Sequence, residues 1–509
     1  MKEEILPGDR ARSESKQVFW NYFSILSGQL GSMALNLFIL SISARALQPA
    51  GYGVLSLFLM VVSLLTMLVI NWPNQAIVRF GKEEFLKTGK IAEVFWARIV
   101  IFAFALAASL AIIFFLGDRI TGYIGISRNG LYLLVSYILI SSVYEMAPCV
   151  LQATGNMKVF GFLPVFEKSA TLALLLLVFF RVIPVSVPSV LLCTMAGQAV
   201  VIIVALSKAK PGVFRPLEFP GYRMRQILGY SWSLSIGAAT SFAVGWIDIV
   251  IIRLFLPVSS VGVYSVAYKG MTFLSAMIMS TISLTFPLIT SLRTTGRYDL
   301  IVRYLDELIP PGVLVWSFFL SFIIAVSGLF IPLLLGESYR PAITPFVILV
   351  IGIAFNSIGC FYSGITGAFD LVKETVLMSV FLSIFNLLGD VLLVPAMGIN
   401  GASVAKVISI SAINLFYIPL INHQGSFGAR RKRFLVNIWA MPALITLLGC
   451  LVFQSWYLRV AVFTAVVAVF LVIAKRAGVF SERTTEIVDY IDMPRTLKNA
   501  MNGVIRRMS

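Results

Sequence analysis

The chain has 509 residues, of which 59% are hydrophobic and only 12% are charged, and its mean hydropathy is +0.93. A soluble globular protein carries about 25% charged residues, so the composition excludes that class and indicates a protein of the lipid bilayer. The first sixteen residues, MKEEILPGDRARSESK, are strongly charged. They lack the apolar core of a cleavable signal peptide, so we expect the first membrane helix to direct insertion.

Apolar segments long enough to cross a membrane follow one another along the chain. Crossing about 30 Å of hydrocarbon takes about 20 helical residues. The sequence therefore predicts an all-α polytopic membrane protein with about fourteen transmembrane helices. The segments are 18–44, 52–78, 92–116, 130–152, 160–181, 187–207, 227–255, 260–291, 309–335, 342–366, 375–396, 400–422, 435–453 and 457–474.

Lysine and arginine residues predict the orientation. Most of the 40 lie on the side that holds the N-terminus. By the positive-inside rule, both termini are expected in the cytoplasm of a multi-pass protein of the cell membrane. The net charge of +17 then reflects topology and attraction to anionic lipid headgroups, and we expect no nucleic-acid partner. The opposite side holds only Arg45, Arg119, Arg128, Arg181, Arg253, Arg340 and Arg459.

The sequence repeats itself once. The stretch RALQPAGYGVLSLF, starting at Arg45, has a counterpart in RLFLPVSSVGVYSV, where Arg253 and Pro257 match Arg45 and Pro49 at an offset of 208 residues. That offset covers six expected helices, an even number, so the two halves would insert in the same direction as two pseudo-symmetric lobes. The alternative is chance recurrence of glycine, proline and serine in membrane loops.

The repeat and the segment lengths together predict the domain organisation. Apolar residues recur at three- and four-residue spacing within 483–508, which is typical of an amphipathic helix on a membrane surface. The predicted parts are a cytoplasmic N-terminal segment (1–17), an N-lobe (18–207), a basic cytoplasmic linker (208–226), a C-lobe (227–422), two further helices (435–474) and a cytoplasmic amphipathic tail (475–509).

Neither a metal site nor a cofactor is expected. The four cysteines lie inside apolar runs without CxxC spacing, so we interpret them as small buried hydrophobic residues. The single histidine, His423, has no neighbouring cysteine or carboxylate with which to build a zinc site.

Acid and base residues inside the apolar segments form three expected pairs. Each pair flanks a hairpin turn nearly symmetrically, so its members would lie at matching depth on adjacent helices. A charge at mid-bilayer costs about 2.5 kcal/mol or more, so each needs a partner or a water-filled cavity. The pairs either only neutralise one another or form a binding site. They are Glu145 with Lys168, Asp248 with Lys269, and Asp390 with Lys406.

The stretch WIDIVIIRLFLPVSSVGVYSVAYK resembles the signature of polysaccharide transporters in the multidrug/oligosaccharidyl-lipid/polysaccharide exporter superfamily. ALQPAGYGVLSL, NQAIVRFGKEE and VPAMGINGASVAKVIS are similar to that family too. The resemblance covers about residues 17 to 475. It implies two six-helix lobes, with two C-terminal helices that form a groove for a lipid tail. It also implies a flippase that moves polyprenyl-pyrophosphate-linked oligosaccharide across the cytoplasmic membrane by alternating access, for surface polysaccharide biosynthesis.

This resemblance gives the paired charges an expected role. The lysines would attract the pyrophosphate, while the carboxylates would prevent over-tight binding or titrate to couple transport to an ion gradient. The implied partners are the lipid-linked oligosaccharide, membrane lipids and polysaccharide-assembly enzymes. The substrate-binding candidates are Lys269, Asp248, Lys168, Glu145, Lys406 and Asp390. Aromatic residues that could stack on sugars, or could simply anchor helix ends at the membrane interface, are Trp72, Tyr144, Trp246, Tyr264, Tyr268 and Trp316.

Three other functions fit the sequence less well. A drug/cation antiporter of the same superfamily would need unpaired acidic residues in its cavity, whereas each deep carboxylate here has a candidate lysine partner. A lipid II flippase has cationic groups in its first lobe as well, but the repeat partner of Lys269 is Met60. An O-antigen polymerase or ligase would need a sizeable periplasmic loop with catalytic groups, and the expected loops are short, so we expect no enzymatic activity.

Overall fold

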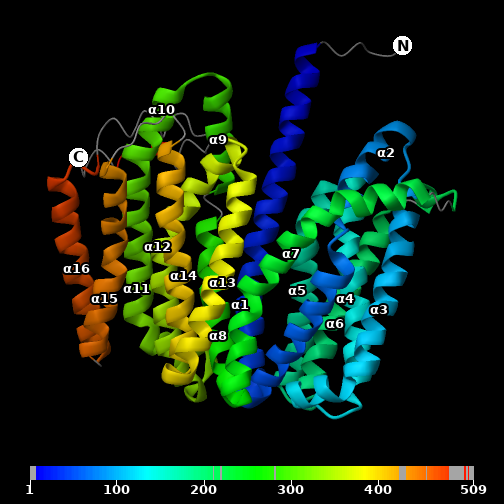
Figure 1. Cartoon of the computed structure of the whole chain (residues 1–509), viewed down its shortest axis with the longest axis horizontal. Coiled ribbons are helices and arrows are strands. Elements are labelled where there is room, and N and C mark those ends of the chain that lie inside the picture. Colours follow the sequence, from blue (N-terminus) through cyan, green and yellow to red (C-terminus); the bar gives the residue numbers. More distant parts are fainter. Residues whose placement is uncertain are drawn as a thin grey trace. The chain divides into compact units, whose positions relative to one another are not determined.

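The computed structural model describes residues 7–209, 211–217, 221–279, 282–423, 431–453 and 455–480, together with residues 498, 499 and 503. Every regular element within these ranges is a helix (Figure 1), which confirms the all-α fold class. The chain forms two compact units, Met1–Trp246 and Ile247–Ser509, and their boundary falls inside the long helix α7 (Gly221–Phe255). Apart from those three residues, the expected amphipathic helix of 483–508 lies outside the described residues.

The first unit is built from long apolar helices joined by short turns. Helix α5 packs against α1 and α6, and α4 packs against α6. The second expected membrane segment is not a regular α-helix throughout, because its end consists of two π-helical segments, η1 and η2, separated by a turn. The elements before α7 are α1 (Pro7–Leu65), η1 (Thr66–Asn71), η2 (Ile77–Gly81), α2 (Lys82–Thr88), α3 (Ala92–Ile124), α4 (Gly130–Ala153), α5 (Met157–Phe179), α6 (Val187–Lys208) and the 3₁₀ turn η3 (Pro211–Phe214).

Helix α1 is kinked at Gln48, whose backbone is not helical (φ 56°, ψ 170°). The following residue, Pro49, has no backbone N–H and disfavours a helical conformation in the residue before it, which accounts for the position of the kink. The side chain of Gln48 donates from Nε2 to the carbonyl oxygen of Arg45 at 2.8 Å. The expected turn between the first two membrane segments is therefore a kink within a nearly continuous helix.

Two glycines bring α1 and α5 into close contact. A Cβ atom on Gly28 would overlap the carbonyl group of Gly161, and a Cβ on Gly161 would lie 2.9 Å from the backbone nitrogen of Ile25. Small residues at helix crossings in membranes allow this close approach, because dispersion contacts between backbones replace the hydrophobic driving force available in water.

A buried arginine stabilises the turn between η1 and η2. Arg98 of α3 is 1% exposed and donates from Nε and Nη2 to Oδ1 of Asn74 at 3.0 and 2.8 Å. Its Nη2 also donates to the carbonyl oxygen of Ile70 at 2.6 Å. That carbonyl lies in the irregular part of the helix, so the guanidinium group satisfies backbone and side-chain acceptors that the break exposes.

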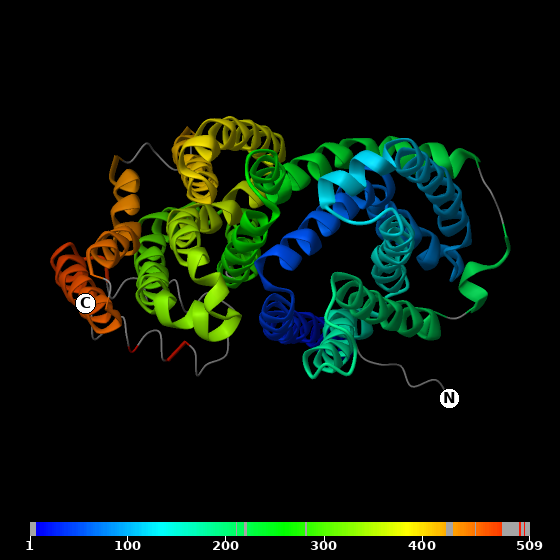
Figure 2. The same cartoon turned by 90° about the horizontal axis from the view of Figure 1, so that it is seen from below.

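The second unit contains the remaining helices. α12 packs against α8, α9, α11 and α14, and α13 packs against α14. In Figure 2 most of these helices are seen nearly end-on, with α15 and α16 at the edge of the unit, where both pack against α11. The elements are α8 (Val258–Met279), α9 (Ile282–Thr294), α10 (Tyr298–Arg303), η4 (Tyr304–Leu308), α11 (Ile309–Leu335), η5 (Glu337–Ala342), α12 (Ile343–Ala368), α13 (Val372–Met397), α14 (Ile399–His423), η6 (Arg431–Ala440), α15 (Met441–Val452) and α16 (Trp456–Arg476).

Twelve helices in the described part of the chain are long and apolar enough to cross a membrane, rather than about fourteen. One difference arises because the first two expected segments run together as the single stretch Ser27–Asn71. The other is the expected segment 260–291, whose first part, α8, contains serines, tyrosines and Lys269 and is not among the twelve. The predicted boundaries of the two lobes and of the linker stay predictions, although α7 begins at Gly221, before the expected 227.

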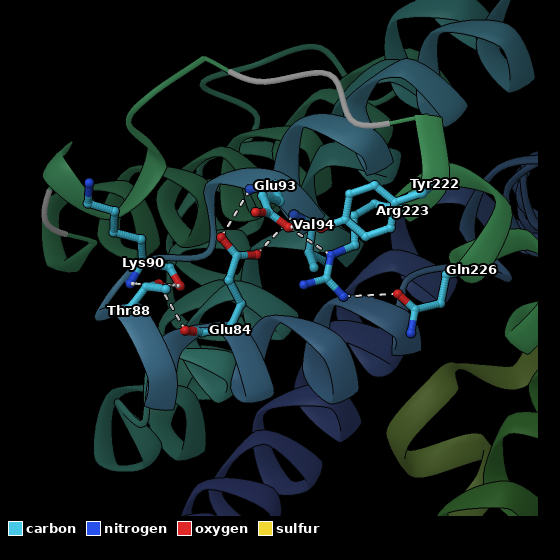
Figure 3. A network of polar contacts seen from close by, with 8 residues as sticks. All are labelled: Glu84, Thr88, Lys90, Glu93, Val94, Tyr222, Arg223 and Gln226. Carbon is cyan, nitrogen blue, oxygen red and sulfur yellow. Dashed lines mark hydrogen bonds and ion pairs between the residues drawn. The ribbon is translucent and has the colours of Figure 1, made fainter.

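A polar network fastens the start of α7 to α3 within the first unit (Figure 3). The carboxylate of Glu84, on α2, accepts the backbone N–H groups of Glu93 and Val94 at 3.0 Å each, and so caps the N-terminus of α3. The carboxylate of Glu93 in turn accepts the hydroxyl of Tyr222 at 2.5 Å and Nε of Arg223 at 2.9 Å. Burial raises the pKa of Glu84, although its two bonds to backbone N–H groups act in the opposite direction.

The Glu84 cap can be tested by substitution. Glu84→Ala should destabilise the protein by about 1–2 kcal/mol, because two backbone N–H groups at the start of α3 lose their acceptor. For a unit of this size, each 1 kcal/mol lowers the melting temperature by about 2–4 °C, which thermal unfolding of the purified protein can measure.

The neighbouring residue provides the control for this prediction. Glu83 is exposed, and its ion pair with Arg79 is long, at 4.0 Å. Such surface pairs contribute little, so Glu83→Ala should change stability by less than about 0.5 kcal/mol. Equal melting temperatures for the two variants would contradict the capping role of Glu84.

Candidate functional site

Five polar side chains meet inside the second unit and form what we call the buried charge cluster: Asp248, Tyr264, Asn386, Asp390 and Lys406. They come from four helices. α7 supplies Asp248, α8 supplies Tyr264, α13 supplies Asn386 and Asp390, and α14 supplies Lys406. Because Asn386 and Asp390 are four residues apart, they lie on the same face of α13. The cluster therefore links helices that are far apart in the sequence.

Asp248 is the common acceptor of the cluster. Nζ of Lys406 donates to Asp248 Oδ1 at 3.1 Å, and Nδ2 of Asn386 donates to the same oxygen at 2.6 Å. The Tyr264 hydroxyl donates to Asp248 Oδ2. Nδ2 of Asn386 also donates to Asp390 Oδ2 at 3.0 Å, so one amide group bridges the two carboxylates.

The cluster is almost completely buried. Asp248 and Lys406 are each 2% exposed and Asp390 is 0% exposed. One ammonium group thus faces two carboxylates at a depth where water does not screen them. Oδ1 of Asp390 and Oδ1 of Asn386 are also buried and have no hydrogen-bond partner within the described residues. Buried acceptors of this kind are costly, which suggests a role beyond neutralisation.

Aromatic rings border the lysine of the cluster. The Lys406 ammonium lies 5.5 Å from the centroid of the Tyr268 ring, and this ring stacks on that of Tyr264 with centroids 6.1 Å apart. Lys269 follows Tyr268 on α8 and is half-buried. Tyr264 is a candidate for sugar stacking or interfacial anchoring, but it is fully buried and its hydroxyl donates to the carboxylate of Asp248.

A second polar group lies in the first unit. Nζ of Lys168 pairs with Oε1 of Glu167 at 2.8 Å, and the Tyr144 hydroxyl donates to Oε2 of the same carboxylate at 2.8 Å. The Lys168 side chain is 29% exposed. Glu145, by contrast, is exposed. The expected pairing of Glu145 with Lys168 was therefore wrong, because the adjacent Glu167 provides a closer carboxylate.

Of the other two expected pairs, the structure brings Asp248, Asp390 and Lys406 together in the buried charge cluster. Lys406 pairs with Asp248, the expected partner of Lys269, and Asp390 joins the same cluster through Asn386. The pairing of Asp248 with Lys269 stays a prediction. Sequence analysis missed Asn386 and Glu167. The four-residue spacing of Asn386 and Asp390 was the available signal for the first, and the position of Glu167 beside Lys168 was the signal for the second.

Similarity to known proteins extends over most of the chain. The solved structure of the lipid II flippase MurJ in an inward closed conformation matches with a TM-score of 0.67 and 14% identity, over 89% of this chain and 99% of that one. An inward-facing multidrug resistance MATE family transporter of the MOP superfamily matches with a TM-score of 0.60 and 13% identity, over 80% and 95% of the two chains. At such identities these likenesses establish the fold alone.

Sequence comparison identifies the family. A curated relative from Haloferax volcanii, named "Probable flippase AglR", is 27% identical over 197 residues, which make up 36% of this chain and 39% of the relative. The match thus spans less than half of that protein. The family described as polysaccharide biosynthesis protein matches residues 42–344. This match covers more than half of the chain, so the chain belongs to the polysaccharide biosynthesis protein family.

Proposed function

We propose that the protein is a flippase that moves polyprenyl-pyrophosphate-linked oligosaccharide from the cytoplasmic to the outer leaflet of the cell membrane by alternating access. The family membership, the flippase name of the curated relative and the fold shared with a lipid II flippase support this proposal. Both termini would lie in the cytoplasm. The further partners would be membrane lipids and polysaccharide-assembly enzymes. The protein would act as a transporter and not as an enzyme.

The observation that carries the proposal is the buried charge cluster. A buried ion pair stabilises a protein little compared with well-packed apolar residues, and its desolvation in a bilayer is expensive. The Asp248–Lys406 pair therefore needs a reason other than stability. A transporter provides one, because charged groups that join four helices can exchange partners when those helices move.

Within this proposal the two kinds of lysine have different tasks. Lys406 is almost fully buried and held by Asp248, so it would fix the relative positions of α7 and α14. Lys269 and Lys168 are partly exposed, so each would contact phosphate oxygens from within its own unit. An ammonium group can leave a carboxylate for a pyrophosphate, because both are charged acceptors and the phosphates offer more oxygens. Asp390 and Glu145 would limit how tightly the anion is held.

A second candidate function is a drug/cation antiporter of the same fold. The cluster contains two carboxylates and one ammonium group, and a buried oxygen of Asp390 has no hydrogen-bond partner in the described structure, which favours an antiporter. An antiporter would bind a cation there in exchange for its substrate. The following experiment separates the two functions.

Deletion of the gene tests the proposed function directly. A lipid-linked oligosaccharide should accumulate on the cytoplasmic leaflet, and the surface polysaccharide should disappear, because the saccharide can no longer cross the membrane. Lipid extraction with mass spectrometry and leaflet-specific lectin labelling would measure both. Unchanged lipid-linked saccharides together with new sensitivity to cationic drugs would instead establish the antiporter.

Lys269 can be tested by complementing the deletion strain. Lys269→Ala should reduce transport about tenfold or more, since a charge-assisted contact is worth about 1.5–3 kcal/mol. Lys475→Ala, which changes an exposed lysine near the end of α16, is the matched control and should transport normally. If Lys269→Gln, which removes the charge but keeps the length of the side chain, transports at the wild-type rate, Lys269 makes no charge-assisted contact with the substrate.

The buried pair makes a separate prediction. Lys406→Met should destabilise the protein by about 3–5 kcal/mol, because it leaves Asp248 without its ammonium partner in a dry site. Asp248→Asn combined with Lys406→Met should recover most of the melting temperature, since Asp248 then no longer carries an uncompensated buried charge. Transport should stay impaired in this double variant. Full transport activity would show that the pair is a neutral structural element.

A further inference from the structure

The buried charge cluster contains two neighbouring acceptor oxygens that no donor serves in the described structure. The amide group of Asn386 has two N–H bonds, and Nδ2 donates to Asp390 Oδ2 at 3.0 Å and to Asp248 Oδ1 at 2.6 Å. The remaining oxygens of the two α13 side chains, Oδ1 of Asn386 and Oδ1 of Asp390, are buried without a hydrogen-bond partner among the described residues. Both side chains lie on one face of α13, because they are four residues apart.

The charged and titratable groups around Asp390 come from three other helices. α7 contributes Asp248, α8 contributes Tyr264 and α14 contributes Lys406. α12, which also contacts α13, has no acidic or basic residue in its sequence. The Tyr264 hydroxyl and the Lys406 ammonium group both donate to Asp248. Asp248 is therefore the ionised partner of the lysine, and Asp390 is a second carboxyl group in the same dry site.

α13 and α14 approach each other closely beside Asp390. A Cβ atom on the preceding residue, Gly389, would lie only 2.9 Å from the Cβ of Ala405 on α14. Ca²⁺ and Mg²⁺ take six or more oxygen ligands, whereas Asp248, Asn386 and Asp390 together offer only two side-chain oxygens that do not already accept a hydrogen bond. A proton needs neither the space nor the ligands of a metal ion.

We propose that Asp390 is a proton-binding site and is a neutral carboxylic acid in this conformation, with its proton on Oδ1 and donated to Oδ1 of Asn386. A protonated carboxyl group has one O–H donor and still accepts hydrogen bonds. With the existing bond from Nδ2 of Asn386 to Oδ2 of Asp390, this donor completes an acid–amide pair that is joined by two hydrogen bonds. Ionised Asp248 then neutralises Lys406, and the cost of a second buried negative charge is avoided.

The proton also gives the cluster a second state. When Asp390 releases it to water, two ionised carboxylates are left joined by the amide of Asn386, and like charges so close repel each other. The acid–amide pair breaks at the same time, because its O–H donor is lost. In the proposed flippase, on which this consequence rests, Asp390 would limit the binding of the pyrophosphate only in this deprotonated state.

Infrared difference spectra test the protonation state in the full-length protein. Wild-type protein and Asp390→Asn are placed in nanodiscs at pH 7, and the two spectra are subtracted. The wild-type protein should show the carbonyl stretching band of one protonated carboxylic acid that the variant lacks. Asp299→Asn is the matched control, because it changes an exposed aspartate of the same unit and should remove an ionised carboxylate band. An ionised carboxylate band for Asp390 as well would overturn the proposal.

The pH dependence of stability is a second test. Asp390→Asn imitates the neutral acid and can still donate to Asn386, so it should fold and melt within a few degrees of the wild type at pH 7. An aspartate in an unfolded chain is ionised above about pH 4, whereas folded Asp390 keeps its proton. As the pH rises, the unfolding equilibrium constant of the wild type should therefore increase by up to about tenfold per pH unit relative to the variant. Parallel pH profiles, or a variant that does not fold, would contradict the proposal.

Exchange of cations separates a proton from a metal ion. Replacing sodium by choline at the same ionic strength should leave the melting temperature of the wild-type protein unchanged. A stabilisation that requires sodium and that Asp390→Asn abolishes would assign the two oxygens to a metal ion and overturn the proposal. Since no transport is measured, such a failure would leave the flippase function untouched, and the gene deletion tests that function separately.

Discussion

The fold depends on one constraint: a chain that crosses hydrocarbon must satisfy its own polar groups. Regular helices do this for the backbone. Where the structure departs from a regular helix, a side chain takes over, as Arg98 does at the break between η1 and η2 and Gln48 does at the kink of α1. At both of these irregular positions a polar side chain therefore satisfies a backbone carbonyl that the regular helix would otherwise have bonded.

The same constraint explains why the charged residues gather. A lone lysine or aspartate in the bilayer is expensive, and an amide or a hydroxyl reduces the cost by supplying further hydrogen bonds. Asp248 accepts from Lys406, Asn386 and Tyr264. Both carboxylate oxygens of Asp248 have hydrogen-bond donors, whereas Oδ1 of Asp390 has none among the described residues. A proton or a cation at Asp390 would therefore change the net charge of the cluster.

Sequence analysis predicted the helices well, because long apolar runs leave few alternatives. It also found the charged residues, because a lysine or an aspartate stands out in such a run. It could not predict their partners reliably. Hairpin symmetry pairs residues on consecutive helices, whereas Asp248 and Lys406 are 158 residues apart and meet only because α7 and α14 contribute to one cluster. Glu167 was overlooked because Glu145 fitted the symmetry, and the capping role of Glu84 depends on a turn that no periodicity encodes.

The distances along the chain between the buried cations and their acceptors have a consequence for biosynthesis. Arg98 finds its acceptors 24 and 28 residues upstream, so they are already synthesised when it leaves the ribosome. Asp248 meets the Tyr264 hydroxyl after only 16 residues, but its lysine follows 158 residues later. During synthesis, α7 must therefore enter the membrane before its counter-charge exists. The second unit can complete its charge cluster only when α14 has been inserted, so this cluster forms late in the assembly of that unit.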